Sequence, residues 1–198
     1  SNSNHQELID ILNKNYPLEI TFQQSHNNQE LKGWMLIGGK GKARTEFSPP
    51  NNYLIVADGK WLIFHDPEIE RTTYIPIESG ILQALLNPQS IIDPNKFRIE
   101  KNIDNQYISF SILLNLQNEN QEVRIYFDKN NFNLKGWDIT ESTGQKINVK
   151  VMSINKLSLE KVNENFFKLT EKMRNSGNIY FGPYERKIIK FLDNGRLN

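Results

Sequence analysis

Residues Asn51 to Thr73 read NNYLIVADGKWLIFHDPEIERTT, and this stretch decides the fold class. Two short apolar runs flank Asp58-Gly59, where a glycine tolerates the positive φ of a two-residue hairpin turn. The second run ends in Asp66-Pro67, which favours a turn, and residues 69–74 then have the composition of a third strand. The stretch therefore predicts an antiparallel meander with enough apolar surface to need a cover.

Outside this stretch, alternation of apolar and polar residues with period two predicts further strands. The alternation is clearest in Leu18 to Gln23, and shorter apolar runs follow along the chain. Further strands are expected at residues 18–23, 33–37, 43–47, 97–102, 107–116, 122–128, 134–140 and 146–153. Together with the meander they make about ten or eleven strands, which predicts a mainly β (α+β) protein with an antiparallel sheet.

Two short helices are expected beside this sheet. Glu7 to Leu12 has apolar residues at helical spacing and is followed by Tyr16-Pro17, where a helix should end. Glu78 to Asn87 is amphipathic and stops before Pro88, and we expect it to pack on one face of the sheet. With 198 residues, the chain is expected to form a single domain, 1–198, that buries a sizeable core.

Composition excludes several classes of protein. The net charge of +1 argues against nucleic-acid binding, which normally requires a concentrated basic surplus. The absence of cysteine excludes disulfides, thiolate zinc sites and cysteine nucleophiles. The longest apolar helical run, Ile81 to Leu86, is far too short to span a bilayer. Ser1 to Asn4 fits a remnant in front of a mature protein whose signal peptide has been removed.

Motifs for catalysis and metal binding are missing from the sequence. His5, His26 and His65 do not have the spacing of a zinc site and have no identifiable nucleophile beside them. The glycine-rich stretch from Gly38 to Lys42 lacks the spacing of a phosphate-binding loop, so a hairpin is the better interpretation. Asp58 and Asp66 are turn residues. The sequence predicts no catalytic residue and no metal site.

Apolar and aromatic residues on strand faces are abundant instead. They recur at alternate positions from Phe22 to Tyr74 and again from Phe110 to Val149. An ordinary packed core explains each of these residues singly. As a set, they also fit a strongly curved sheet with few helices on its concave side, which would leave an apolar cavity for a lipid or an acyl chain. The pattern leaves both interpretations open.

A resemblance to a known family favours the second interpretation. The chain resembles the LolA family of periplasmic lipoprotein carriers over residues 5–169, and the stretch from Val56 to Asp66 is its most specific part. The residues that carry the resemblance are Phe22-Gln23-Gln24, Gly33-Trp34, Arg44, Pro50, Ile55 to Trp61, Asp66-Pro67, Arg71-Thr72, Ile139 to Gln145, Phe166 and Phe167.

The resemblance implies an incomplete, strongly curved antiparallel β-barrel of about eleven strands, with short helices covering the opening. It implies a monomeric periplasmic chaperone that carries lipoproteins from an inner-membrane exporter to the outer membrane, and to an outer-membrane receptor where one exists. Such a carrier is not an enzyme and has no cofactor. It would hold acyl chains between the sheet and the helix at Ile81 to Leu86. The candidate residues of this cavity are Phe22, Trp34, Leu36, Leu54, Val56, Trp61, Ile63, Tyr74, Ile81, Leu82, Leu85, Phe110, Ile125, Phe127 and Trp137.

The chain departs from the family pattern in two places. Many carriers have a basic residue followed by proline at the end of the second strand, and that basic residue helps to hold the lid closed. Gly38-Gly39-Lys40 stands there instead, so Lys40 and Arg44 are the candidates for a lid latch. The second departure is residues 170–198, which form a C-terminal extension that is less similar to the family.

Two other functions remain as alternatives. One is another binding module of the same fold, either an outer-membrane lipoprotein receptor or a sensor domain related to regulators of anti-sigma factors. A lipidated cysteine in the precursor would favour the receptor. The other is an enzyme of the same curved-sheet fold, which polar residues clustered inside the cavity would support.

Overall fold

The computed structural model describes residues 2–51, 53–114 and 121–169. Residues 170–198, the predicted C-terminal extension, lie outside the described residues. The described elements are α1 (Asn2–Asn15), β1 (Leu18–His26), β2 (Gln29–Gly39), β3 (Lys42–Phe47), β4 (Leu54–Asp58), β5 (Trp61–Asp66), β6 (Arg71–Pro76), η1 (Ile77–Ser79), α2 (Gln83–Leu86), η2 (Pro88–Ile92), β7 (Phe97–Ile103), β8 (Tyr107–Leu114), β9 (Glu122–Asp128), β10 (Leu134–Thr140), β11 (Lys146–Lys156), η3 (Leu159–Lys161) and η4 (Glu164–Phe167).

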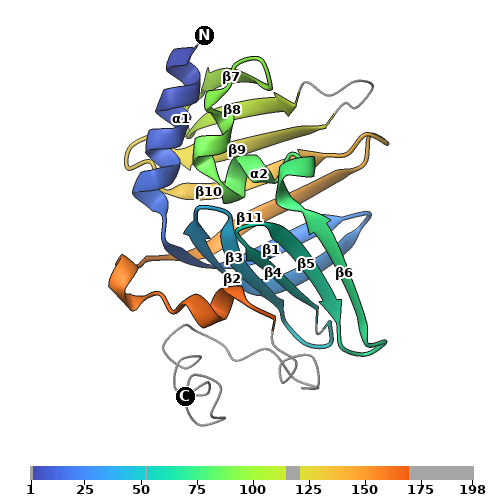
Figure 1. Ribbon diagram of the computed structural model, residues 1–198. Coiled ribbons are helices and arrows are strands. Elements are labelled where there is room, and N and C mark those ends of the chain that lie inside the picture. The colour runs from blue at the N-terminus through green and yellow to red at the C-terminus, as the bar shows by residue number, and fades with distance from the viewer. Residues whose placement is uncertain (1, 52, 115–120, 170–198) are drawn as a thin grey trace.

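The strands form an eleven-stranded antiparallel sheet in the order β6-β5-β4-β3-β2-β1-β11-β10-β9-β8-β7. This confirms the predicted mainly β class. Strands β6 and β7 are the two edges, so the sheet is an open barrel. In the middle, β1 pairs with β2 on one side and with β11 on the other, which joins the two halves of the chain. Figure 1 shows α1 beside β7 to β10 and α2 over the middle of the sheet.

The meander predicted from residues 51–74 is confirmed as β4, β5 and β6. Val56 faces Ile63 across the first hairpin, and Ile63 faces Tyr74 across the second. The Asp58 carboxylate accepts hydrogen bonds from the backbone N–H of Lys60 at 2.9 Å and of Trp61 at 2.7 Å. Asp58 is therefore a turn residue, because these bonds hold the chain reversal at Gly59 and Lys60, between β4 and β5.

The helix predicted at residues 78–87 is wrong in its extent. The structure has a 3-10 turn, η1, then the four-residue α2, and then a second 3-10 turn, η2. Gly80 is the reason, since its backbone is extended, with φ −138° and ψ 171°. An extended residue cannot continue the helical hydrogen-bond ladder, so the amphipathic stretch is divided at this glycine.

The sheet buries apolar side chains on both faces. The helix-covered face packs against α1, α2 and η2 and carries the largest core cluster, which includes Leu18, Ile20 and Phe22 of β1. The opposite face is covered by the C-terminal segment, residues 157–169. In this segment Phe166 and Phe167 are buried against Trp34 and Leu36 of β2. Strands β2, β4 and β5 therefore bury apolar side chains on both faces of the sheet.

Candidate functional site

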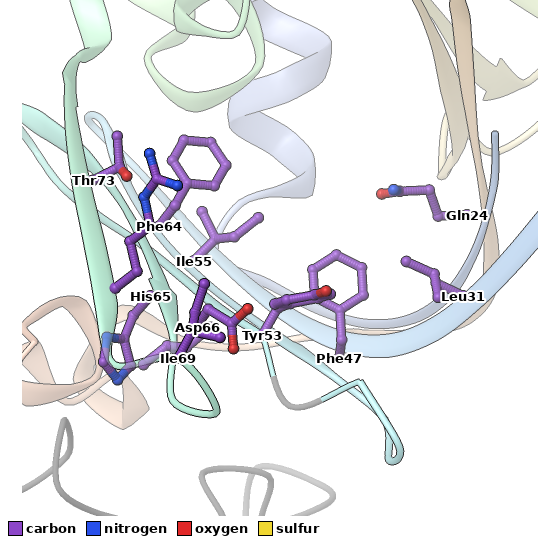
Figure 2. A pocket seen from close by; sticks show the side chains of 12 residues that line it. Gln24, Leu31, Phe47, Tyr53, Ile55, Phe64, His65, Asp66, Ile69 and Thr73 are labelled. Atoms are coloured by element: carbon purple, nitrogen blue, oxygen red, sulfur yellow. The ribbon is translucent and has the colours of Figure 1, made fainter. Parts of the chain in front are cut away.

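A pocket of about 380 Å³ opens on the helix-covered face, at the end of the sheet away from α2. Its volume lies within the range of ~300–1,000 Å³ that is usual for small-molecule sites. Figure 2 shows Gln24 and Leu31 on one side, Phe64 and Thr73 on the other, and Phe47 between them. The residues that line it are Gln24, Leu31, Phe47, Tyr53, Leu54, Ile55, Phe64, His65, Asp66, Ile69, Arg71 and Thr73.

Strand register explains the apolar floor of this pocket. Ile55 faces Phe64 across β4 and β5, and Phe64 faces Thr73 across β5 and β6. Directly opposed residues lie on the same side of a sheet, so these three form a row across neighbouring strands. Thr45 of β3 faces Ile55, and Phe47 lies two residues further along on the same face. Its ring packs edge-on against Phe22, with 5.6 Å between the ring centroids.

The apolar floor continues beneath the helices. At the far end of β3, β4 and β5, the side chains of Ala43, Ala57 and Leu62 pack with Ile77, and Leu82 and Leu86 contact the same cluster. Ile55 and Phe64 line the pocket and also pack against this cluster. The uncovered pocket and the helix-covered apolar surface are therefore contiguous.

The rim of the pocket is polar. Gln24, Asp66, Arg71 and Thr73 contribute side chains to it. His65 is buried and hydrogen-bonds through Nδ1 to the Thr72 hydroxyl at 2.9 Å. An apolar floor with a polar rim can hold an apolar chain and leave its polar group near the solvent.

The residues from η1 to η2, numbers 77–92, form a lid over the helix-covered face. Hydrogen bonds tie α2 to residues outside the lid: the Tyr16 hydroxyl donates to the Leu85 carbonyl at 2.8 Å, the Gly41 N–H donates to the Leu86 carbonyl at 2.8 Å, and Lys96 Nζ donates to Gln83 Oε1 at 3.1 Å. Burial raises the pKa of Tyr16 well above its usual range, so the hydroxyl keeps its proton and remains a donor at neutral pH.

The structure corrects the two latch candidates. Arg44 lies on the opposite face of the sheet, where its guanidinium contacts Glu46 Oε1 at 3.1 Å and donates to the Phe166 carbonyl at 3.3 Å. It therefore holds the C-terminal segment and is not placed at the lid. Lys40 is exposed in the β2–β3 turn, with a backbone φ of 55°. The hydrogen bond from this turn to the lid comes from the N–H of the next residue, Gly41.

Replacing Tyr16 with phenylalanine is expected to loosen the lid. The variant loses one buried hydrogen bond, which lowers the free energy of unfolding by about 0.5–1.5 kcal/mol. Amide hydrogen exchange at residues 83–86 should become faster. Tyr126→Phe is the matched control, because its hydroxyl donates to Asp138 at 2.7 Å and the pair lies on β9 and β10. Equal exchange at residues 83–86 in the two variants would show that Tyr16 does not hold α2.

The structure divides the fifteen predicted cavity residues between the two faces. Eight belong to the packed core on the helix-covered face: Phe22, Ile81, Leu82, Leu85, Phe110, Ile125, Phe127 and Trp137. Seven lie on the opposite face: Trp34, Leu36, Leu54, Val56, Trp61, Ile63 and Tyr74. Of all fifteen, Leu54 alone lines the pocket as well, at the end of β4.

The expectation that all fifteen residues line one cavity is thus corrected for the seven residues on the opposite face of the sheet. Ile55 of β4 and Phe64 of β5 form the pocket floor on the helix-covered face, and each is one position away from a predicted residue. Successive side chains of a strand point to opposite faces, so a shift by one residue changes the face. Both faces are apolar here, and the alternation therefore carried no signal that could identify Ile55 and Phe64.

A family model and a curated relative show the family of this chain. Residues 16–170 match the family described as outer membrane lipoprotein carrier protein LolA. The outer-membrane lipoprotein carrier protein of Aeromonas salmonicida (strain A449) is 26% identical over 144 residues, which cover 71% of this chain and 69% of that protein. No helix in the described parts of the chain is long and apolar enough to cross a membrane.

Solved structures share the fold at low sequence identity. MucB matches with a TM-score of 0.50 and 8% identity over 85% of this chain, and the chain spans 64% of the MucB chain. A LolA superfamily protein from Nitrosomonas europaea has a TM-score of 0.45 and 7% identity, over 83% of this chain and 97% of that chain. The likeness to MucB concerns the fold alone.

Proposed function

Because the chain belongs to the LolA family of outer membrane lipoprotein carrier proteins, we propose that it is a periplasmic lipoprotein chaperone. It binds the acyl chains of lipoproteins on the helix-covered face of the sheet and shields them from water. It then carries them from an inner-membrane exporter to the outer membrane, as a single-domain monomer. It is a binding protein and not an enzyme.

One observation carries this proposal: the apolar row of Phe47, Ile55 and Phe64 is open at the pocket and continues beneath the lid. Each methylene that is removed from water contributes about 0.8 kcal/mol, so an acyl chain gains from every step along this row. The acyl chain would enter at the pocket. The core beneath α2 is already filled by protein side chains, so the acyl chain advances only as the lid lifts.

A lid held by few bonds suits a carrier that must also release its cargo. Opening requires breaking the hydrogen bonds of Leu85 and Leu86 with Tyr16 and Gly41. The lid also loses the bond of Gln83 with Lys96, and that of Ile77 with Lys60 if η1 moves with α2. A ligand that binds the open state shifts the equilibrium toward it, and transfer of the ligand to a better host lets the lid return. The lid therefore supplies a difference in affinity between loading and release.

Titration of the purified protein with a fluorescent fatty acid and with a triacylated peptide tests the function. Saturable binding of both is expected, with the bound chain in an apolar environment. If neither probe binds saturably, the proposed function is wrong. A chaperone should also keep a triacylated lipoprotein soluble in the absence of detergent, at one lipoprotein for each protein chain.

Phe64→Ala tests the position of the site. The ring forms part of the pocket wall, and burial of a phenylalanine-sized surface contributes about 1.5–3 kcal/mol, so binding of the fatty acid should weaken by tenfold or more. Met152→Ala is the matched control, because Met152 is 54% exposed on β11, outside the pocket. Equal affinities of the two variants would place the acyl site elsewhere.

A further inference from the structure

Two large apolar side chains at the polar rim of the pocket are not fully covered by the described part of the chain. Ile69 is 65% exposed and Tyr53 is 42% exposed, and both line the pocket. The same rim is acidic, since the turn between β5 and β6 carries Asp66, Glu68 and Glu70, with Arg71 as the cation of this turn. A segment that covered this rim would need apolar side chains accompanied by positive charge.

The described part of the chain ends next to this pocket. Leu169 packs against the cluster of Leu54, Val56 and Ile63, and Leu54 also lines the pocket. Leu169 therefore lies one side chain away from the pocket wall. Because an extended chain spans about 3.3 Å per residue, a segment some twenty residues further on can reach every part of the rim.

The sequence beyond Leu169 has the required composition. Residues 170–198 contain six basic residues and three acidic residues, in contrast to the acidic turn at the pocket. Within them, Ile188, Ile189, Phe191 and Leu192 form an apolar run, and its basic neighbours are Arg186, Lys187 and Lys190. Apolar and basic residues thus stand together in one short stretch, the arrangement that complements the rim.

We propose that residues 186–192 dock in the pocket of their own chain. The apolar run covers Ile69, Tyr53 and the floor beside Phe64, and the basic residues lie against the acidic turn. A tethered segment has an effective concentration of about millimolar, so even a weak contact is populated. If the pocket binds acyl chains, as the proposed function holds, this segment is an internal competitor that an arriving acyl chain must displace.

Cysteine cross-linking in the full-length protein tests the docking, because the chain has no cysteine of its own. The test variant carries Thr73→Cys, at an exposed residue that lines the pocket, together with Ile189→Cys. The control variant carries Met152→Cys, at an exposed residue of β11 outside the pocket, together with Ile189→Cys. A disulfide requires Cα atoms about 4.4–6.8 Å apart, so docking should make the test pair oxidise roughly tenfold faster than the control pair.

Two further measurements bear on the proposal. Charge reversal by Arg186→Glu, Lys187→Glu and Lys190→Glu should slow the intrachain cross-link of the test pair, and added salt should slow it too. Equal oxidation rates of the test and control pairs would overturn the inference. So would a test cross-link that forms between chains and scales with protein concentration, because the occupant would then be a second copy.

Binding of the fluorescent fatty acid separates this inference from the proposed function. With docking and acyl binding both present, the charge-reversed variant should bind the fatty acid several-fold more tightly than the original protein. A selective cross-link without any acyl binding would leave the docking intact and refute the carrier function. Acyl binding with equal cross-linking rates would leave the carrier function intact and refute the docking.

Discussion

Glu46→Leu is expected to lower the free energy of unfolding by about 3–5 kcal/mol, because it removes the carboxylate that neutralises a buried guanidinium. The side chains of Arg44 and Glu46 are both 0% exposed, and Arg44 Nε lies 3.1 Å from Glu46 Oε1. They lie on β3 beneath the C-terminal segment, where Arg44 also donates to the Phe166 carbonyl. Urea unfolding followed by tryptophan fluorescence measures the loss.

Two controls isolate the effect of the buried charge. The double variant Arg44→Met, Glu46→Leu should recover most of the stability, since an apolar pair of similar volume often replaces a buried ion pair at little cost. Glu164→Gln removes the carboxylate of an exposed ion pair. In this pair the Lys42 side chain is 34% exposed and the Glu164 side chain is 65% exposed. That change should cost less than about 1 kcal/mol. A loss in Glu46→Leu as small as that in Glu164→Gln would contradict the prediction.

The second large effect is expected for Asn15→Ala, with a loss of about 3 kcal/mol. The Asn15 side chain is 1% exposed and joins the end of α1 to the loop before β10. Its Nδ2 donates to the carbonyls of Ile11 at 3.0 Å and Phe132 at 2.9 Å, and its Oδ1 accepts from the Leu134 N–H at 3.0 Å. Truncation leaves buried backbone groups without partners, at about 1–3 kcal/mol each.

Denaturant unfolding and hydrogen exchange together test this prediction. The Leu134 amide should lose protection in Asn15→Ala. Asn131→Ala is the control in the same loop, because Asn131 is exposed and its side chain accepts from the nearby Asn133 N–H. That variant should change the stability by less than about 0.5 kcal/mol. A Leu134 amide that stays protected in Asn15→Ala would show that the loop is held by other contacts.

Local chemistry explains why much of the fold could be predicted. Asp58 with Gly59, and Asp66 before Pro67, are turn residues whose effect depends on backbone hydrogen bonds within three residues. Period-two alternation then located the strands between the turns. These signals are short in range, so the sequence carries them without reference to the rest of the molecule.

The pocket could not be predicted because it depends on which strand face meets which partner. Ile55 and Val56 are equally apolar neighbours, yet Ile55 lines the pocket and Val56 packs in the cluster that Leu169 contacts. Arg44 and Glu46, two charged residues at alternate positions, are typical of a solvent-exposed face in sequence. Their burial follows from the C-terminal segment, more than one hundred residues away.

The pairing of β1 with β11 has a consequence for how the chain becomes folded. Leu18 lies opposite Lys156, and Ser25 lies opposite Asn148, so the middle of the sheet joins residues separated by more than one hundred positions. Contacts of such high sequence separation form slowly, because a long loop must close first. Until β11 has left the ribosome, β1 and β10 both keep an unpaired edge. The eleven-stranded sheet is thus completed only after β11 has been synthesised.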